Sequence, residues 1–145
     1  MDENRQLFIL AGNGPYENRG CEAIVRGTVE ILKSRFDKPQ FLCASFFNGR
    51  EQFLQQRETE IDPNITHVAI NTYKKNDPMF YIRYGALRLS DRLHGEILYR
   101  NLKQFLPMAE GVLSVGGDNY TLSGNHLPKN YISLDNFAIR NRTPI

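Results

Sequence analysis

Short apolar runs alternate along the chain with longer segments in which apolar and polar residues recur at helical spacing. The apolar runs have the length of buried strands and cover Leu7–Ala11, Gln40–Ser45, Ile65–Ile70 and Gly111–Val115. The longer segments predict helices at Cys21–Phe36, Phe46–Arg57, Asp77 to about Phe105, and Tyr131–Arg140. Strands that alternate with helices are typical of parallel βαβ units joined by right-handed crossovers, so the pattern predicts an α/β fold.

Two of these helices have a side on which apolar residues gather. On the first helix, helical spacing predicts a buried face made of Ala23, Ile24, Thr28, Ile31 and Leu32, whereas Arg26, Glu30 and Lys33 lie elsewhere. On the long third helix, the same spacing predicts one side made of Ile82, Leu89, Leu93 and Ile97. Pro78 takes the expected first position of that helix, and Pro107 closes it.

The composition is that of an ordinary globular domain. The chain has 145 residues, of which 41% are hydrophobic and 23% charged, enough to form one core. Its net charge of +2 is too small to indicate nucleic-acid binding. The two cysteines have neither the number nor the spacing of a disulfide framework or a zinc site, so we expect no metal and no cofactor.

The two ends of the chain carry different information. Met1 to Gln6 is polar and partly acidic, unlike the basic start of a secretory signal, and no run approaches the roughly 18 apolar residues that span a bilayer. We therefore expect a cytoplasmic protein. Asn141 to Ile145 is similar to the loop and first residue of a further strand, which predicts a chain cut before a second domain. The alternative is a frayed natural terminus.

The first candidate for chemistry is the polar, glycine-rich loop from Gly12 to Gly20, which follows the first strand and precedes a helix. Open α/β sheets bind ligands at the carboxyl ends of their strands, and the start of a helix favours anions. Arg19 adds a planar fork suited to phosphate or carboxylate, and Asn13 and Asn18 add polar groups. The spacing matches neither a dinucleotide fingerprint nor a P-loop. A solvated turn in which Asn18 or Gly20 caps the helix is the alternative.

The second candidate is the loop that begins at Gly116 and Gly117, directly after the fourth strand. Two adjacent glycines leave room for a ligand or for another loop. Asp118 and Asn119 follow them and carry groups that bind sugar hydroxyls. A plain turn is the alternative interpretation.

The segment of the predicted long helix is basic. It carries seven cationic residues against three acids, namely Lys74, Lys75, Arg83, Arg88, Arg92, Arg100 and Lys103 against Asp77, Asp91 and Glu96. A solvated helix face is the usual meaning of such a pattern. The alternatives are a weak association with membrane phosphates and a homodimer formed through this helix.

Two segments resemble the polysaccharide pyruvyl transferase family. After the first strand, Asn18, Gly20, Glu22 and Ala23 match an Asn-x-Gly-Asp-Glu-Ala-like turn, with Cys21 where an Asp is usual. The segment from Ala109 to Asp118, AEGVLSVGGD, is similar to the family's Ala-Asp-x-Val-(Ile/Leu)-Ser-x-Gly-Gly-Gly segment, with Glu110 and Asp118 as departures. The two segments occur in the family's order, about ninety residues apart, and the resemblance extends over nearly the whole chain.

The resemblance implies a Rossmann-like domain, a three-layer parallel sheet with helices on both faces, that forms the N-terminal half of a GT-B-like enzyme. Such an enzyme transfers pyruvate from phosphoenolpyruvate to two hydroxyls of a sugar and forms a ketal on a cell-surface polysaccharide or its lipid-linked precursor. It also implies substrate-binding roles for Asn18, Gly20 and Glu22 in the first loop, and for Gly116, Gly117, Asp118 and Asn119 in the second. The family's catalytic His and Arg residues lie mostly in the C-terminal half, so we expect this chain alone to be inactive.

Two other functions stay open. One is a GT-B-like glycosyltransferase domain that uses a sugar nucleotide, and the other is a non-catalytic α/β interaction module. Fold alone does not separate these three readings, whereas the choice of donor does. Phosphoenolpyruvate should stabilise a pyruvyl transferase, a sugar nucleotide should stabilise a glycosyltransferase, and neither should stabilise an interaction module.

Overall fold

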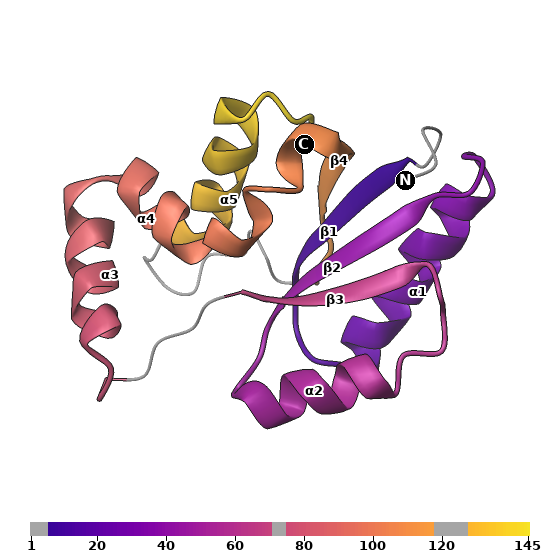
Figure 1. Cartoon of the computed structure of the whole chain (residues 1–145), viewed down its shortest axis with the longest axis horizontal. Coiled ribbons are helices and arrows are strands. Elements are labelled where there is room, and N and C mark those ends of the chain that lie inside the picture. The colour runs from indigo at the N-terminus through magenta and orange to yellow at the C-terminus, as the bar shows by residue number, and fades with distance from the viewer. Residues whose placement is uncertain (1–5, 71–74, 118–127) are drawn as a thin grey trace.

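The computed structural model describes residues 6–70, 75–117 and 128–145. Strands and helices alternate along these residues (Figure 1). The elements, with two short 3-10 turns η1 and η2, are β1 (Leu7–Asn13), α1 (Arg19–Lys33), β2 (Gln40–Phe46), α2 (Arg50–Glu58), β3 (Ile65–Ile70), α3 (Pro78–Leu89), α4 (Asp91–Leu98), η1 (Arg100–Leu102), η2 (Leu106–Met108), β4 (Ala109–Ser114) and α5 (Lys129–Arg140).

The strands of the described residues form one four-stranded parallel sheet in the order β3-β2-β1-β4. The chain builds the sheet outward from β1 to β2 and β3, and then returns to add β4 on the other side of β1. The order therefore reverses between β1 and β4, which defines the topological switch point of a Rossmann-like α/β fold. The predicted α/β class and parallel sheet are confirmed.

Successive apolar residues of the inner strands point to opposite faces of the sheet, so the sheet has a core on each face. One core lies under α1 and contains Phe8, Leu10, Val25, Val29, Phe41, Cys43, Ile65 and Val115. The other lies under α4, α5 and the 3-10 turns and contains Ile9, Ala11, Leu42, Ala44, Ile70, Leu98, Tyr99, Leu102, Leu106, Val112, Leu134, Phe137 and Ala138. The three layers, with α1 and α2 on one face and α4 and α5 on the other, are visible in Figure 1.

The predicted long helix from Asp77 to Phe105 is wrong, because the chain breaks at Ser90. The Ser90 backbone is extended, with φ −167° and ψ 130°, and its N–H donates to the Ala86 carbonyl at the end of α3. The Ser90 hydroxyl then accepts a hydrogen bond from the Arg92 amide at 3.2 Å and caps α4. The break lets α4 pack against both α3 and α5. It also leaves most of the predicted apolar side in solvent, with Leu89 81% exposed.

The predicted buried face of the first helix is wrong for most of its residues, although Leu32 packs against the core as expected. Val25 and Val29 of α1 face the sheet, whereas Ile31 is 66% exposed. Arg26 and Lys33 lie beside the sheet instead of in solvent. They pair with Glu60 and Asp62, two acids that precede β3. The two ion pairs join α1 to the segment that precedes β3.

Several element boundaries differ by a few residues from the predicted ones. β1 continues through Gly12 to Asn13, and α1 begins at Arg19. Phe46 ends β2 and so does not begin α2, which starts at Arg50. At the end of the chain, the Pro144 carbonyl accepts a hydrogen bond from the Val112 amide at 2.8 Å, so these residues lie along the edge of β4 that faces away from β1.

Candidate functional site

The two candidate loops leave the sheet next to each other. β1 and β4 are parallel neighbours in which Ala11 pairs with Ser114, and one step further the Val115 amide donates to the Ala11 carbonyl at 2.9 Å. The glycine-rich loop that follows β1 and the Gly116–Gly117 pair that follows β4 therefore share one edge, at the switch point. This arrangement follows from the predicted parallel sheet, because parallel strands all end on one side of the sheet. Asp118 and Asn119 lie outside the described residues.

The exit from β1 needs glycine at two positions. Gly12 has φ 87°, a left-handed conformation that side chains disfavour, and the β1–β2 register shifts beside it. A Cβ atom at Gly14 would meet the Cys21 Sγ at 3.1 Å, so the loop passes close to the start of α1. At the other loop, no atom of the described residues lies within 4 Å of a Cβ atom placed at Gly117. The second loop thus has open space beside its backbone.

Three candidate residues serve the start of α1. The Asn18 side-chain oxygen accepts a hydrogen bond from the Gly20 amide at 3.0 Å, so Asn18 is the N-cap of the helix. Arg19 is 88% exposed and donates to Glu22 at 2.9 Å. Asn18 and Glu22 are therefore engaged within the protein, and the Arg19 guanidinium reaches into solvent. A ligand that binds Asn18, Arg19 or Glu22 would compete with these local contacts.

Asn13 sits deeper than the other candidates. It is 2% exposed, and its side-chain amide donates to the Cys21 carbonyl at 3.2 Å. Within the described residues, its Oδ1 atom has no hydrogen-bond partner, and neither does the buried hydroxyl of Ser45, the residue that pairs with Asn13 on β2. Buried polar atoms without partners are uncommon in proteins and often mark the place of a water or ligand group.

A buried chain of hydrogen bonds connects the first loop to β3. The Tyr16 amide donates to Gln56 Oε1 at 2.7 Å, and Gln56 Nε2 donates to His67 Nδ1 at 3.2 Å. His67 Nε2 donates in turn to the Glu60 carboxylate at 2.7 Å. The Gln56 amide nitrogen can only donate and the ionised Glu60 carboxylate can only accept. His67 therefore accepts at Nδ1 and carries its hydrogen on Nε2. The series fixes the position of the loop at Tyr16.

The charges in this cluster are set by burial and pairing. Burial alone would raise the pKa of Glu60, but hydrogen bonds from the Asp62 amide, Arg26 and His67 outweigh it and lower that pKa. Burial lowers the pKa of His67. At neutral pH the cluster therefore holds an ionised Glu60, a neutral His67 and the charged Arg26. Burial also raises the pKa of the Cys43 thiol to about 12, so Cys43 is not a nucleophile at neutral pH.

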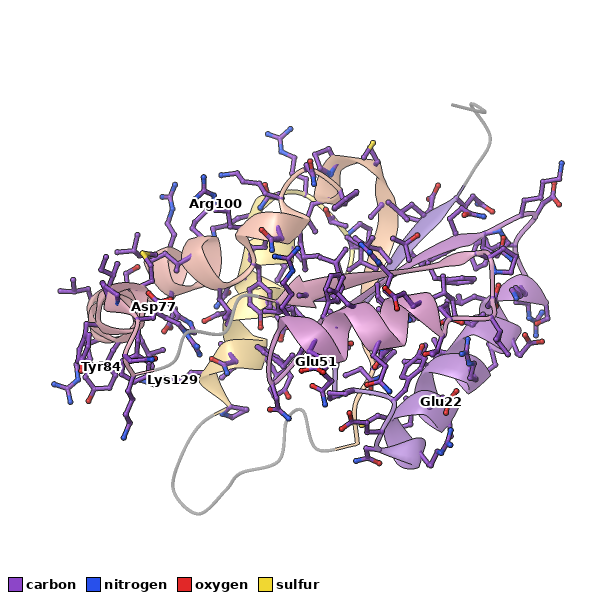
Figure 2. The ribbon with its side chains drawn as sticks, turned by 60° about the horizontal axis from the view of Figure 1, so that its bottom comes forward. Glu22, Glu51, Asp77, Tyr84, Arg100 and Lys129 are labelled. Atoms are coloured by element: carbon purple, nitrogen blue, oxygen red, sulfur yellow. The ribbon has the colours of Figure 1, made fainter. Side chains whose placement is uncertain are left out.

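A pocket of about 360 Å³ opens above this cluster, between the first loop, α1 and α2. Its lining is polar and consists of Tyr16, Glu17, Arg19, Glu22, Arg26, Gln52, Gln55, Gln56 and Thr59. Glu22 of α1 and Glu51 of α2 mark this side of the protein in Figure 2. Both arginines of the pocket already pair with carboxylates, Arg19 with Glu22 and Arg26 with Glu60. An anion in this pocket would therefore have to displace a carboxylate from one of the two arginines, and only Arg19 is largely exposed.

This cluster was not among the residues that the sequence predicted to form a site. A signal was present: His67 stands two residues after Ile65 in a strand, and both side chains are buried. A polar residue at an inward position of a strand needs a buried partner. The identity of the partners, Gln56 and Glu60, depends on how α2 packs and has no local signal.

We expect the Glu60 pairing to appear as stability that is lost in acid. Glu60→Gln keeps the shape but removes the charge that balances the partly buried Arg26, and should lower the free energy of unfolding at pH 7 by about 1.5 kcal/mol. Because the pKa of Glu60 is lowered by folding, this stabilisation is complete above its ordinary value near 4.5 and disappears as pH falls further. The difference between the two proteins should therefore shrink in urea unfolding at pH 3.5.

Glu58→Gln is the matched control, since Glu58 is an exposed carboxylate at the end of α2. Its unfolding free energy should stay within about 0.5 kcal/mol of the wild-type value. Equal costs for the two substitutions would show that the buried cluster does not hold the loop region in place.

Comparisons with known proteins add no assignment: no protein-family model, curated protein or solved structure matches the chain. Among the residues that the structure describes, no group of His, Cys, Asp and Glu side chains could hold a metal ion. No helix in that part of the chain is long and apolar enough to cross a membrane.

Proposed function

We propose that this chain is the N-terminal, Rossmann-like half of a GT-B-like polysaccharide pyruvyl transferase. The observation that carries the proposal is the meeting of the two family-like segments at the switch point. Asn18 to Ala23 follows β1, Ala109 to Gly117 forms β4 and its exit, and β1 and β4 are adjacent and parallel. Segments about ninety residues apart in sequence thus border one ligand-binding edge.

The edge suits an anionic donor such as phosphoenolpyruvate. The start of α1 contributes the positive end of a helix dipole, the open Gly117 backbone leaves space, and the exposed Arg19 can exchange Glu22 for a phosphate or carboxylate. Pyruvyl transfer protonates the enol carbon, adds two sugar hydroxyls to the neighbouring carbon and releases phosphate. We assign this half to holding substrate groups in the cleft.

Proton transfer would fall to the second half of the enzyme. The two described histidines, His67 and His94, are 3% and 0% exposed and so cannot reach a substrate in this conformation. A general acid must come within hydrogen-bond distance of the reacting atom. The proposal places the reaction in the cytoplasm, where phosphoenolpyruvate is formed, with a saccharide or lipid-linked saccharide as the acceptor.

The test is an NMR titration of the ¹⁵N-labelled chain with phosphoenolpyruvate. We expect amide shifts confined to Gly12–Gly20 and Gly116–Gly117, and no acceptor-dependent phosphate release by the chain alone. Shifts produced by a sugar nucleotide, but not by phosphoenolpyruvate, would favour a glycosyltransferase domain. The absence of shifts with either compound would favour an interaction module, and rapid phosphate release would place the catalytic groups in this chain.

A further inference from the structure

We propose that α3 docks on the surface of a membrane that carries anionic lipids. This helix lies at one end of the molecule, away from the sheet, and its principal contacts are with α4 (Figure 1). Figure 2 shows Tyr84 and Asp77 at that end, far from Glu22 of α1. The inference concerns binding to a lipid surface and does not depend on the donor or on the reaction.

One side of α3 is apolar and in solvent. The helix buries Ala86, which is 2% exposed, against the protein. The side of α3 that faces away from the protein and the adjoining start of α4 present large apolar side chains, of which Leu89 is 81% and Tyr81 65% exposed. We call Tyr81, Ile82, Tyr84, Leu89 and Leu93 the α3 face. A group of large apolar side chains exposed on one side of a helix is typical of an interaction surface.

Two polar contacts support this orientation of α3. Arg83 points inward, where its Nε donates to His94 Nε2 at 3.4 Å and its guanidinium donates to the Asn130 side chain, also at 3.4 Å. His94 is fully buried and hydrogen-bonds to Ser133 of α5 at 3.0 Å. Because Arg83 bonds to both α4 and α5, the apolar residues on the other side of α3 are held facing outward.

The charge around the α3 face selects the partner. Arg83 points inward and does not contribute to this surface. Between residues 75 and 103 there remain five exposed cations and three acids, an excess of two positive charges, from Lys75, Arg88, Arg92, Arg100 and Lys103 against Asp77, Asp91 and Glu96. Arg88 lies over the Tyr84 ring at 4.7 Å and donates to its hydroxyl at 2.6 Å. Apolar residues with tyrosines and flanking arginines form the usual pattern of a helix that lies in a membrane interface.

The same charge argues against a second copy of the chain as the partner. Two α3 faces in contact would bring both positive excesses together, and like charges oppose association. Anionic headgroups instead neutralise the cations while the apolar side chains enter the acyl boundary. The surface is therefore complementary to an acidic membrane.

Docking through α3 would also bring the candidate edge toward the bilayer. α3 follows the carboxyl end of β3, the edge that bears both loops, and borders the first turn of α5 around a pocket of about 610 Å³ that includes Tyr84, Arg88 and Lys129. This placement suits a lipid-linked acceptor. That consequence, unlike the docking itself, rests on the proposed function.

A tryptophan reporter tests the docking directly, because the chain contains no tryptophan. The emission of Tyr81→Trp should shift to shorter wavelength with phosphatidylcholine vesicles that contain about 30% phosphatidylglycerol, and less so at high salt. Ile61→Trp is the control, since Ile61 is 86% exposed in the segment before β3, at the opposite edge of the sheet. An equal shift for both reporters, or none for Tyr81→Trp, would overturn the proposal.

Vesicle sedimentation of the chain gives a second measurement. Replacing Ile82 and Leu89 together by serine should weaken binding to the acidic vesicles at least about tenfold, whereas Ile31→Ser on α1 should leave it unchanged. Ile31 is a suitable match because it is 66% exposed on another helix. A concentration-dependent dimer that the paired substitution dissociates, without vesicle binding, would identify a second copy as the partner and refute membrane docking.

Discussion

Replacement of Gly95 by valine should destabilise the protein by about 3 kcal/mol and lower its Tm by roughly 10 °C. Gly95 lies in α4 where that helix crosses α5 at close range. A Cβ atom there would stand 3.0 Å from the Ser133 carbonyl and 3.6 Å from the Phe137 Cβ. Both atoms belong to the α5 backbone or its first side-chain atoms, so neither can rotate aside. Valine adds two further carbons, and the helices must separate to hold them.

Matched alanine substitutions isolate the steric effect. Gly95→Ala adds one carbon to the crossing and should destabilise the protein, despite the better helix propensity of alanine. Gly27→Ala, in the middle of α1, meets nothing within 4 Å and should stabilise the protein by up to about 1 kcal/mol. Denaturant unfolding measures both. If both alanine variants changed the free energy of unfolding in the same direction, α4 and α5 would not pack closely at Gly95.

The strands could be predicted from the sequence because each buried strand is a single continuous run of apolar residues. Each inner strand is covered on both faces, so its apolar residues are continuous, and four runs were sufficient to define a parallel sheet. The shared edge of the two loops followed from the same reasoning, since parallel strands all end on one side. The order β3-β2-β1-β4 had no comparable signal, because strand neighbours depend on how the connecting helices pack.

The sequence contains a signal for the break at Ser90, but the apolar spacing around it favours a continuous helix more strongly. Ser90 followed by Asp91 is a typical helix start, with a capping hydroxyl and an acid in the first turn. The apolar spacing of Ile82, Leu89 and Leu93 favoured one uninterrupted helix. That spacing belongs to the exposed α3 face instead of a core, so the periodicity was present but did not indicate burial.

The support beneath the first loop could not be predicted from the sequence. Arg26 and Glu60 are 34 residues apart, and Tyr16 and Gln56 are 40 apart. Such pairs form only when α1, α2 and β3 are already in place. A single sequence carries no local pattern from which these long-range pairs can be predicted. By contrast, the face of α1 that packs on the sheet had a local signal, since Val25, Val29 and Leu32 recur at helical spacing beside the predicted Ala23, Ile24, Thr28 and Ile31.

The last prediction concerns the ligand edge. Gly117→Val should weaken phosphoenolpyruvate binding at least about thirtyfold, equivalent to about 2 kcal/mol, and change the free energy of unfolding by less than about 0.5 kcal/mol. No atom in the described part of the chain lies within 4 Å of a Cβ atom placed at Gly117, so we expect the folded protein to accept the valine. The branched side chain would instead fill space beside the backbone that follows β4, at the edge where β1 also ends. NMR titration gives the affinity, and urea unfolding gives the stability.

Gly49→Val is the control that separates a ligand site from a general effect at this edge. Gly49 follows the carboxyl end of β2, one strand from the switch point, and a Cβ atom there also meets nothing within 4 Å. Its backbone is extended, with φ 173°, so valine fits it. We expect phosphoenolpyruvate to bind this variant as it binds the wild type. Equal losses of phosphoenolpyruvate affinity in both variants, or unchanged binding by Gly117→Val, would show that phosphoenolpyruvate does not bind at the switch point between β1 and β4.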